Sequence, residues 1–341
     1  MKICIVGLGA IGGLFAARLG QRLPPGEITL SALARGATLA AVRQHGLRVH
    51  SAEGLGAVPI AASDDPAALG VQDLVILAVK GPALPAVAPA VAALCGPHTR
   101  VLAAMNGVPW WFFEDLPGTC RGLVLQSVDA GGAVRALLPA ARVLGCVVHA
   151  SATAPAPGEV RPVMGQGLVI GEAGNAAGEG ASLQTVGDLL GRAGFDVTLS
   201  AQVQREVWFK LWGNMTMNPV SALTGAPCDR ILDDDLVRGF CSAVMREAQA
   251  IGAAFGIPIE QAPEARHAVT RKLGSFKTSM LQDAEAGRPL ELDALLGAVR
   301  EIGAHLGQAT PNIDALFGLV RLMAQQRGLY PAAAPASRLS S

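Results

Sequence analysis

The stretch KICIVGLGAIG, residues 2–12, carries the strongest fold signal in this chain of 341 residues. Its apolar start predicts a buried strand, and the pattern G-x-G-x-x-G from Gly7 to Gly12 follows that strand directly and opens a helical stretch. In such a turn the first glycine allows the sharp bend, the second lets a pyrophosphate reach the backbone, and the third lets the helix pack closely on the strand. The stretch therefore predicts a dinucleotide-binding unit of the Rossmann type.

Short β-branched runs alternate with Ala- and Leu-rich helical patterns through the first half of the chain. The runs predict strands over residues 3–6, 28–33, 74–79, 101–104, 122–128, 143–149 and 168–171. Helices are expected over residues 11–19 and between the strands at 74–79 and 101–104, and loops at 155–158 and 172–180. Continuous apolar strands that alternate with helices are typical of a parallel sheet covered on both faces.

Beyond about residue 200 the strand signals nearly vanish and long helical patterns follow. Helices are predicted over residues 202–217, 235–255, 275–286, 291–306 and 312–325, with prolines near their starts and stops. The fold class is therefore an α/β Rossmann-type dinucleotide-binding domain over residues 1–200, followed by an all-helical C-terminal domain over residues 201–330. The Ala-, Pro- and Ser-rich residues 331–341 are expected to form a disordered tail.

The composition narrows the class of protein and the kinds of partner. Hydrophobic residues make up 51% of the chain and charged residues 16%, which argues against a disordered chain. Lys plus Arg and Asp plus Glu both number 27, so the net charge gives no attraction for nucleic acid or an anionic membrane. The six cysteines form no C-x-x-C pair, and no apolar stretch reaches the roughly 20 residues of a spanning helix. We expect a cytoplasmic protein without a metal site, and the helix-rich second half leaves a homodimer open.

The end of the second predicted strand indicates which nicotinamide cofactor binds. NAD enzymes usually place Asp or Glu there to hold the ribose hydroxyls, but no acidic residue lies between Glu27 and Glu53. Arg35 follows this strand instead, where a guanidinium can pair with a 2′-phosphate. The alternative is a solvated loop arginine. The missing carboxylate favours NADPH.

Lys210, Asn214 and Asn218 recur at i, i+4 and i+8, which places them along one face of a helix. The residues between them are mostly apolar, so a buried lysine beside two amides needs a partner. A pocket for an anionic substrate would supply one. A structural network or an exposed polar stripe explains the spacing equally well.

A second polar group lies later in the chain. Ser279 and Asp283 stand at i and i+4, and Glu291 follows the break at Gly287-Arg288-Pro289. Surface and capping roles account for such residues in most helices, and an acid in the first turn is favoured by the helix dipole. Periodicity alone does not make Glu291 a catalytic residue.

Several short segments in both halves of the chain resemble the ketopantoate reductase family in content and in order. The resemblance extends from Met1 to about Arg327. It implies an NADPH-dependent reductase of a small 2-oxo acid. The matching segments are Gly7–Gly12, Arg35, Ala78-Val79-Lys80, Asn106-Gly107, Lys210-Leu211-Trp212-Gly213-Asn214, Asn218 to Thr224, Ser279 to Asp283, and Glu291-Leu292-Asp293.

For the substrate, the resemblance implies reduction of ketopantoate at C2 to pantoate, for pantothenate and coenzyme A synthesis. Lys210 is implied to be the general acid, and Glu291 to contact the hydroxyl region and hold Lys210 in position. Ser279 is implied to bind the substrate carboxylate, and Asn214 and Asn218 the other polar groups of the substrate.

For the cofactor, the resemblance implies contacts from the whole glycine-rich turn, that is Gly7, Leu8, Gly9, Ala10, Ile11 and Gly12, and from Arg35. Lys80 and Asn106 end neighbouring strands at the carboxyl edge of the sheet, where ligands of α/β proteins lie. They are implied to bridge cofactor and substrate, and Glu291 is counted with the cofactor contacts as well.

One segment departs from the family pattern. The run VPWWFF, residues 108–113, follows Asn106-Gly107 and places four aromatics where the family usually has smaller or more polar residues. The aromatics either anchor this loop to the core or reshape the pocket for another branched or aromatic 2-oxo acid. A non-catalytic NADPH-binding sensor is a third interpretation, against which the retention of Lys210, Asn214, Ser279 and Glu291 argues.

Overall fold

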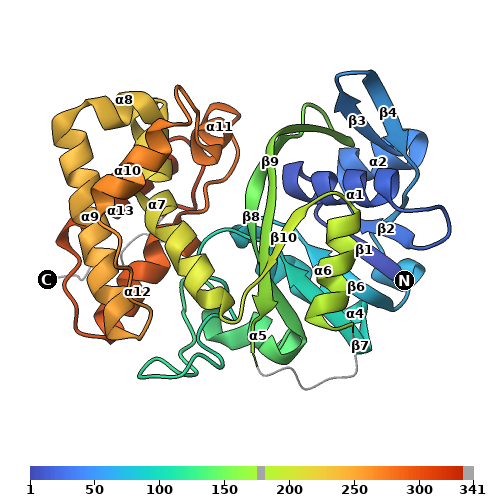
Figure 1. Cartoon of the computed structure of the whole chain (residues 1–341), viewed down its shortest axis with the longest axis horizontal. Coiled ribbons are helices and arrows are strands. Elements are labelled where there is room, and N and C mark those ends of the chain that lie inside the picture. Colours follow the sequence, from blue (N-terminus) through green and yellow to red (C-terminus); the bar gives the residue numbers. More distant parts are fainter. Residues whose placement is uncertain (175–180, 333–341) are drawn as a thin grey trace, which may run out of the picture. The chain divides into compact units, whose positions relative to one another are not determined.

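The predicted strand, turn and helix at the N-terminus are confirmed: β1 (Lys2–Val6) leads through the glycine-rich turn into α1 (Ala10–Arg22) (Figure 1). The computed structural model describes residues 1–174 and 181–332. The chain divides into two units, Met1–Val207 and one that begins at Trp208, so the division lies inside the helix α7 (Val203–Thr224), a few residues beyond the expected boundary near residue 200. The expected tail lies outside the described residues from residue 333 onward, as do residues 175–180 of the expected loop.

One mixed sheet of ten strands forms the centre of the described part of the first unit. The order along the sheet is β4-β3-β9-β8-β7-β6-β1-β2-β5, and β10 pairs with β9. Pairing is parallel from β5 through β2, β1, β6 and β7 to β8. Beyond β1, the strands are β2 (Thr29–Leu33), β3 (Leu47–Ser51), β4 (Gly54–Val58), β5 (Ala61–Ser63), β6 (Gln72–Leu77), β7 (Cys95–Ala103), β8 (Val143–Thr153), β9 (Glu159–Glu172) and β10 (Asp196–Leu199).

The pairing of β8 with β9 departs from the parallel sheet that the sequence pattern predicts. The two strands pair antiparallel, from Leu144 opposite Glu172 to Thr153 opposite Arg161. Residues 154–158 connect them, as the predicted loop at 155–158 indicates. This connection is too short for the crossover of a dozen or more residues that parallel neighbours require, so the chain reverses as a hairpin. The predicted strand at 168–171 is the end of β9.

The prediction of a strand over residues 122–128 is wrong, because residues 122 and 126–128 lie in turns and residues 123–125 have no regular secondary structure. The N–H groups of Val128 and Asp129 both donate to the carbonyl oxygen of Leu125, at 3.1 and 2.8 Å. The N–H of Leu123 donates to the carbonyl of Cys120 at 3.0 Å. These local bonds satisfy backbone groups that a strand would pair with a neighbour.

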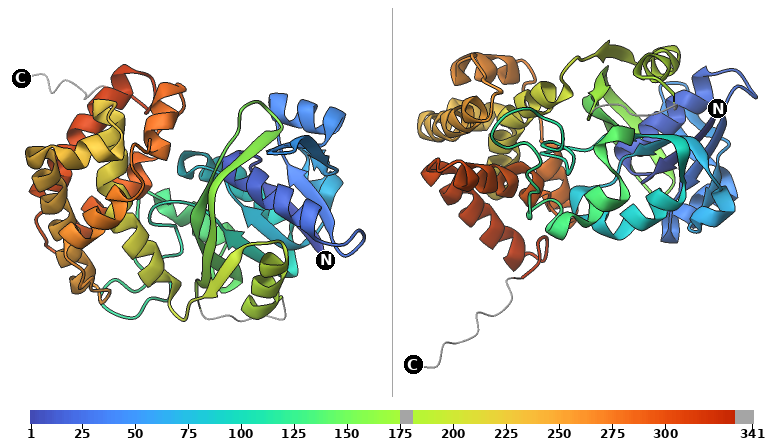
Figure 2. Two further views of the ribbon diagram at one scale, coloured as in Figure 1. Left: turned by 45° about the horizontal axis from the view of Figure 1, so that its top comes forward. Right: turned by 90° about the horizontal axis from the view of Figure 1, so that it is seen from below.

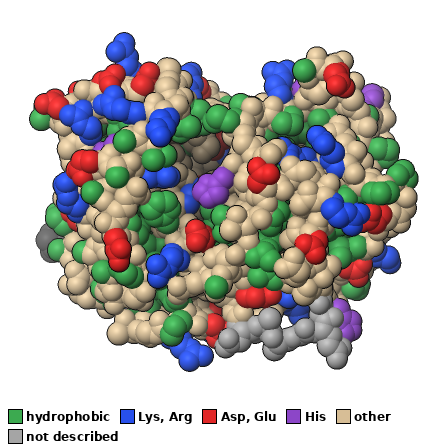
Figure 3. Space-filling view, in the orientation of Figure 1, with side chains coloured by type: hydrophobic (Ala, Val, Ile, Leu, Met, Phe, Trp, Pro, Cys, Tyr) green, Lys and Arg blue, Asp and Glu red, His purple; other side chains and the backbone are tan. Residues whose placement is uncertain are grey.

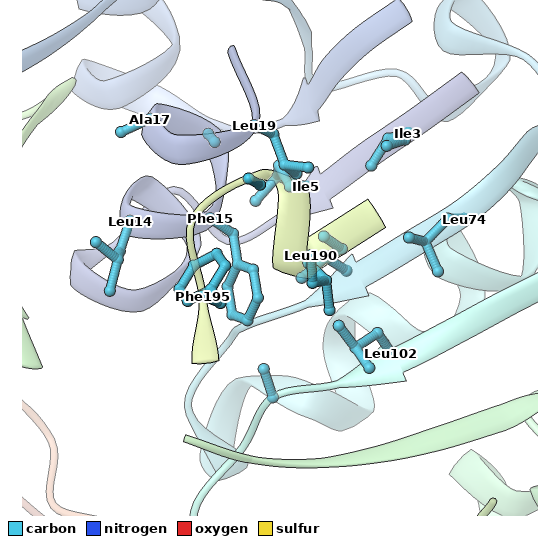
Figure 4. Close-up of a cluster of buried hydrophobic side chains, with 14 of the residues drawn as sticks. Ile3, Ile5, Leu14, Phe15, Ala17, Leu19, Leu74, Leu102, Leu190 and Phe195 are labelled. Atoms are coloured by element: carbon cyan, nitrogen blue, oxygen red, sulfur yellow. The ribbon is translucent and has the colours of Figure 1, made fainter. Parts of the chain in front are cut away.

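Helices cover both faces of the sheet, as predicted. Alternate residues of a strand point to opposite faces, so Ile3 and Ile5 enter one core cluster while Cys4 and Val6 enter another. In the first cluster, Phe15 of α1 packs on Phe195 with ring centroids 5.0 Å apart (Figure 4). α1 also lies against β8 and β9 (Figure 2). The other helices of this unit are α2 (Gly36–His45), α3 (Pro66–Leu69), α4 (Leu84–Ala93), α5 (Ala133–Leu137) and α6 (Leu183–Arg192).

The described part of the second unit is helical throughout, as predicted. α7 continues to Thr224, beyond its predicted end, and the helix predicted from residue 275 begins only at Ser279, because Thr278 caps it by accepting the N–H of Leu281. The predicted helix at 291–306 begins with a π turn at Asp293–Gly297. The helices are α7 (Val203–Thr224), α8 (Cys228–Asp233), α9 (Asp235–Ala254), α10 (Pro263–Arg271), α11 (Ser279–Glu285), α12 (Ala298–His305) and α13 (Pro311–Gln326).

Charged side chains of both signs are interspersed on the face of the molecule that Figure 3 shows. This agrees with a formal net charge of zero. Across residues 1–174 and 181–332, every helix falls short of the length or the apolar character needed to cross a bilayer.

Candidate functional site

The glycine-rich turn after β1 has the geometry that its three glycines predict. Gly7 has a φ of +92°, a conformation that side chains disfavour. A Cβ on Gly12 would lie 2.0 Å from the carbonyl oxygen of Gly7, so only glycine lets α1 approach the turn this closely. A Cβ on Gly9 would meet no atom within 4 Å, and Gly9 is exposed. The turn therefore leaves open backbone at its second glycine.

The N-terminus of α1 is suited to binding an anion. Gly9 is the N-cap of this helix, no side chain caps it, and its first turn contains no acidic residue. Helix N-termini present unpaired N–H groups and a partial positive charge, which is how dinucleotide pyrophosphates are bound. The exposed backbone at Gly9 and the uncapped helix together fit the pyrophosphate of a nicotinamide dinucleotide. Leu8, Ala10 and Ile11 contribute backbone to the same turn.

Arg35 lies at the same edge of the sheet as the glycine-rich turn. β1 and β2 pair in parallel with Val6 opposite Leu33, and the N–H of Gly7 points to the carbonyl of Leu33 at 3.5 Å. Arg35 follows as the exposed N-cap of α2, and its side chain has no ion pair within the described ranges. Glu27, at the opposite end of β2, pairs with Arg192. The end of β2 next to the glycine-rich turn is thus followed by the cation of Arg35 and by no carboxylate.

Lys80 and Asn106 are brought to this edge by β6 and β7. β6 pairs with β1 through Leu77 opposite Val6, and with β7 through Leu77 opposite Ala103. Each polar residue stands three positions beyond the end of its strand and is half-buried. Strand pairing therefore gathers Gly7 to Gly12, Arg35, Lys80 and Asn106 at one edge of the sheet.

In the second unit, α7 carries Lys210, Asn214 and Asn218 on one stripe, as their spacing predicts. Lys210 and Asn214 are half-buried, and Asn218 is only 7% exposed. The helix is anchored by Trp212, whose fully buried indole Nε1–H donates to the carbonyl of Met245 in α9 at 2.9 Å. The polar stripe therefore belongs to a firmly packed helix.

Ser279 and Glu291 lie on neighbouring segments that Asp283 joins. Ser279 is the exposed first residue of α11, and Glu291 is half-buried just before the π turn. The carboxylate of Asp283 accepts from Nε of Arg288 at 2.8 Å, and the carbonyl of Asp283 accepts the N–H of Arg288 at 2.9 Å. Through these two contacts Asp283, whose role the sequence left open, ties α11 to the turn that precedes Glu291.

The C-terminal end of the described chain also holds this region, which the sequence analysis missed. The N–H of Leu290 donates to the carbonyl of Leu329 at 2.9 Å, and the hydroxyl of Tyr330 donates to Oδ1 of Asp293 at 2.6 Å. Burial raises the pKa of Asp293, and burial together with this hydrogen bond raises the pKa of Tyr330. Tyr330 is the single tyrosine of the chain, and this is the one sequence signal that could have drawn attention to it.

The aromatic run at residues 110–113 lies in the interior. All four side chains are at most 5% exposed. The indole Nε1–H of Trp110 donates to the carbonyl of Leu138 at 2.8 Å, and the ring of Trp111 occupies the space above Gly145, where a Cβ would be 2.6 Å from it. This burial favours the interpretation that the aromatics anchor the loop.

Metal-ligand geometry is absent from residues 1–174 and 181–332, since no three His, Cys, Asp or Glu side chains there are placed to share an ion. The six cysteines lie within these ranges and are free thiols.

Comparison with known proteins agrees with the resemblance noted in the sequence. The family Ketopantoate reductase PanE/ApbA matches residues 3–175, and Ketopantoate reductase PanE/ApbA C terminal matches residues 202–324. The 2-dehydropantoate 2-reductase of Mesorhizobium japonicum is 40% identical over 330 residues, covering 97% of this chain and all of the relative.

Among solved structures, one from Ralstonia solanacearum MolK2, assigned to the ketopantoate reductases, is 55% identical with a TM-score of 0.90 and covers 96% of this chain and 99% of its own. D-mandelate dehydrogenase with NADH and anilino(oxo)acetate is 20% identical with a TM-score of 0.81, covering 96% of this chain and all of its own, and shares the fold. Both halves of the chain thus match one family along nearly their whole length, and the chain belongs to the ketopantoate reductase PanE/ApbA family.

Proposed function

We propose that this protein reduces 2-dehydropantoate (ketopantoate) to pantoate with NADPH. The observation that carries the proposal is the 40% identity to a 2-dehydropantoate 2-reductase over 97% of the chain. The pyrophosphate-compatible turn of the first unit and the Lys210 stripe of the second unit support it, because the reaction needs a dinucleotide and a proton donor.

NADPH is the proposed cofactor, and when bound it supplies the hydride. Arg35 stands beyond the end of β2, and no acidic residue follows it before Glu53. A guanidinium pairs with a 2′-phosphate, whereas a carboxylate at this position would bind the free ribose hydroxyls of NADH. Lys80 and Asn106 are proposed to contact both the cofactor and the substrate from the sheet edge.

Lys210 is the proposed general acid. As the C2 carbonyl is reduced, negative charge develops on its oxygen, and the Lys210 ammonium stabilises this charge and then donates the proton that completes the hydroxyl. Glu291 is proposed to hold the Lys210 ammonium in position and to contact the new hydroxyl and the cofactor. Ser279 would bind the substrate carboxylate, and Asn214 and Asn218 its remaining polar groups.

A related reductase of another branched or aromatic 2-oxo acid is the second candidate. The fold shared with D-mandelate dehydrogenase favours keeping it, since that protein was solved with NADH and anilino(oxo)acetate. The burial of residues 110–113 counts against a pocket that these aromatics would reshape.

The experiment is NADPH oxidation by the purified protein with ketopantoate and a panel of branched and aromatic 2-oxo acids. Turnover confined to ketopantoate supports the proposal, preference for another 2-oxo acid moves the protein to the second candidate, and tight NADPH binding without turnover indicates a non-catalytic sensor.

Two variants test the assigned residues. Lys210→Ala is expected to lower kcat roughly 100- to 10,000-fold and to leave NADPH affinity unchanged. The matched control is Lys272→Ala, at the exposed C-terminal end of α10. Arg35→Ala is expected to weaken the binding of NADPH far more than the binding of NADH. Its control is Arg22→Ala, at the far end of α1. Equal losses for NADPH and NADH would place the 2′-phosphate site elsewhere.

A further inference from the structure

β5 brings two carboxylates to the edge of the sheet that carries Arg35. β2 and β5 pair in parallel, with Leu33 opposite Ser63. Arg35 lies two positions beyond Leu33, while Asp64 and Asp65 follow Ser63 directly, and all three charged residues are exposed. Neighbouring strands lie only about 4.8 Å apart. Negative charge therefore stands beside the arginine that is proposed to hold the 2′-phosphate.

A carboxylate at this place opposes the binding of NADPH. The 2′-phosphate carries a charge of about −1.5 to −2 at neutral pH, so a nearby carboxylate repels it. The free ribose hydroxyls of NADH, by contrast, can donate hydrogen bonds to a carboxylate. Because specificity is a difference between two affinities, an acid beside Arg35 with its charge unopposed would shift the preference toward NADH.

The carboxylate of Asp65 is engaged by the helix that follows it. Asp65 is the N-cap of α3, and its Oδ1 accepts the N–H of Ala67 at 2.9 Å. The N–H of Asp65 donates to Oγ of Ser63 at 3.1 Å, and Pro66 begins the helix. These local bonds fix the Asp65 carboxylate on the first turn of α3. Asp64 has no such capping role.

Asp64 is paired instead with an arginine of α2. Nη2 of Arg43 lies 3.8 Å from Oδ1 of Asp64. Nε of Arg43 donates to the carbonyl of Ala62 at 3.1 Å, which holds the guanidinium near the end of β5. The two side chains are 55% and 64% exposed, and ion pairs this exposed contribute little stability. The local charge that the pair sets is therefore a better explanation of its place than stability is.

We propose that Arg43 determines cofactor specificity by neutralising Asp64 beside the 2′-phosphate site. The inference rests on the proposed function and deepens it, because that function assigns the 2′-phosphate to Arg35. Arg43 acts through Asp64 and not by touching the phosphate. The intact pair adds no net charge beside the site, whereas loss of Arg43 leaves one negative charge and loss of Asp64 leaves one positive charge.

The test compares the dissociation constants of NADPH and NADH, measured by fluorescence titration of the full chain. In Arg43→Met the preference for NADPH is expected to fall roughly 3- to 10-fold at low salt, through weaker binding of NADPH. In Asp64→Asn the preference is expected to rise roughly 2- to 5-fold. The affinity for NADH should stay within about twofold in both variants, because NADH lacks the phosphate. Both shifts should shrink at high salt, which screens exposed charges.

A double variant separates neutralisation from direct contact. Arg43→Met combined with Asp64→Asn restores neutrality and is expected to return the preference to within about twofold of wild type. Arg43→Lys keeps the charge and should keep the preference to within about twofold as well. Arg192→Met is the control, because it breaks the pair with Glu27 before the opposite end of β2 and is expected to leave the preference unchanged.

The outcomes separate the two levels of the argument. Wild-type protein that binds NADH as tightly as NADPH would overturn both the proposed cofactor and this assignment. A wild type that prefers NADPH, with the same preference in Arg43→Met, would overturn the assignment alone. A double variant as weak as Arg43→Met would also overturn it, because Arg43 would then contact the phosphate itself. Equal losses of NADPH and NADH in Asp64→Asn would do the same, since the carboxylate would then bind the adenosine that both cofactors share.

Discussion

Replacing Tyr330 with phenylalanine removes one hydroxyl and leaves the ring in place. That hydroxyl donates to Oδ1 of Asp293 at 2.6 Å, at the first residue of the π turn that follows Glu291. A hydrogen bond to a charged acceptor contributes about 1.5–3 kcal/mol. Because Asp293 is half-buried and water can partly replace the hydroxyl, we expect the lower part of this range. Tyr330→Phe should lower the free energy of unfolding by about 1.5–2 kcal/mol at neutral pH.

The loss should depend on pH in a defined direction. Burial raises the pKa of Asp293 above its ordinary value of 3.8, and the Tyr330 hydrogen bond opposes this rise. Without the hydroxyl the folded-state pKa rises further. The folded variant then binds more protons than the unfolded chain above pH 3.8, so its stability falls as pH rises toward the folded-state pKa. The difference in the free energy of unfolding between Tyr330→Phe and wild type should be small below pH 3.8 and complete above the folded-state pKa of Asp293 in the variant.

Urea unfolding at a series of pH values measures both effects. Asp293→Asn and the double variant complete a double-mutant cycle, in which the coupling between the two side chains should account for most of the Tyr330→Phe loss. Equal stability of Tyr330→Phe and wild type at neutral pH would refute the reasoning. A loss of the same size at acid pH would refute it as well, since the bond would then not depend on a carboxylate.

Three further outcomes follow from the described contacts. Gly12→Ala places a Cβ 2.0 Å from the carbonyl oxygen of Gly7 and should weaken NADPH binding roughly tenfold or more in a fluorescence titration, whereas Gly191→Ala, in open space on α6, should not. Arg100→Met leaves Glu172 without its ion-pair partner; the Arg100 and Glu172 side chains are 7% and 30% exposed. The free energy of unfolding in urea should fall by about 2–3 kcal/mol, which is less than for a fully buried pair. An unchanged urea midpoint would exclude a stabilising role for this ion pair. Burial raises the pKa of the thiols of Cys4, Cys228 and Cys241 to about 11, 11 and 12. In the folded protein at mildly alkaline pH these thiols should therefore not react with a chromogenic disulfide. A rapid reaction before unfolding would contradict their burial.

Features encoded within a few consecutive residues were predictable from the sequence. The glycine-rich turn is one, because the demands on Gly7 and Gly12 arise from the local strand-turn-helix geometry. The stripe of Lys210, Asn214 and Asn218 is another, since helical periodicity alone aligns these positions. The roles of these residues came from resemblance to a family, and they remain proposals that the variants above test.

Features that depend on partners far along the chain were not predictable. The direction of β9 was set by its hairpin with β8, and residues 122–128 formed no strand because their backbone found local acceptors. Tyr330 and Asp293 are 37 positions apart, and Arg43 of α2 meets Asp64 beyond the end of β5. Turn chemistry and periodicity are local properties that a sequence displays directly. Which distant groups meet is decided only when the helices and strands pack together.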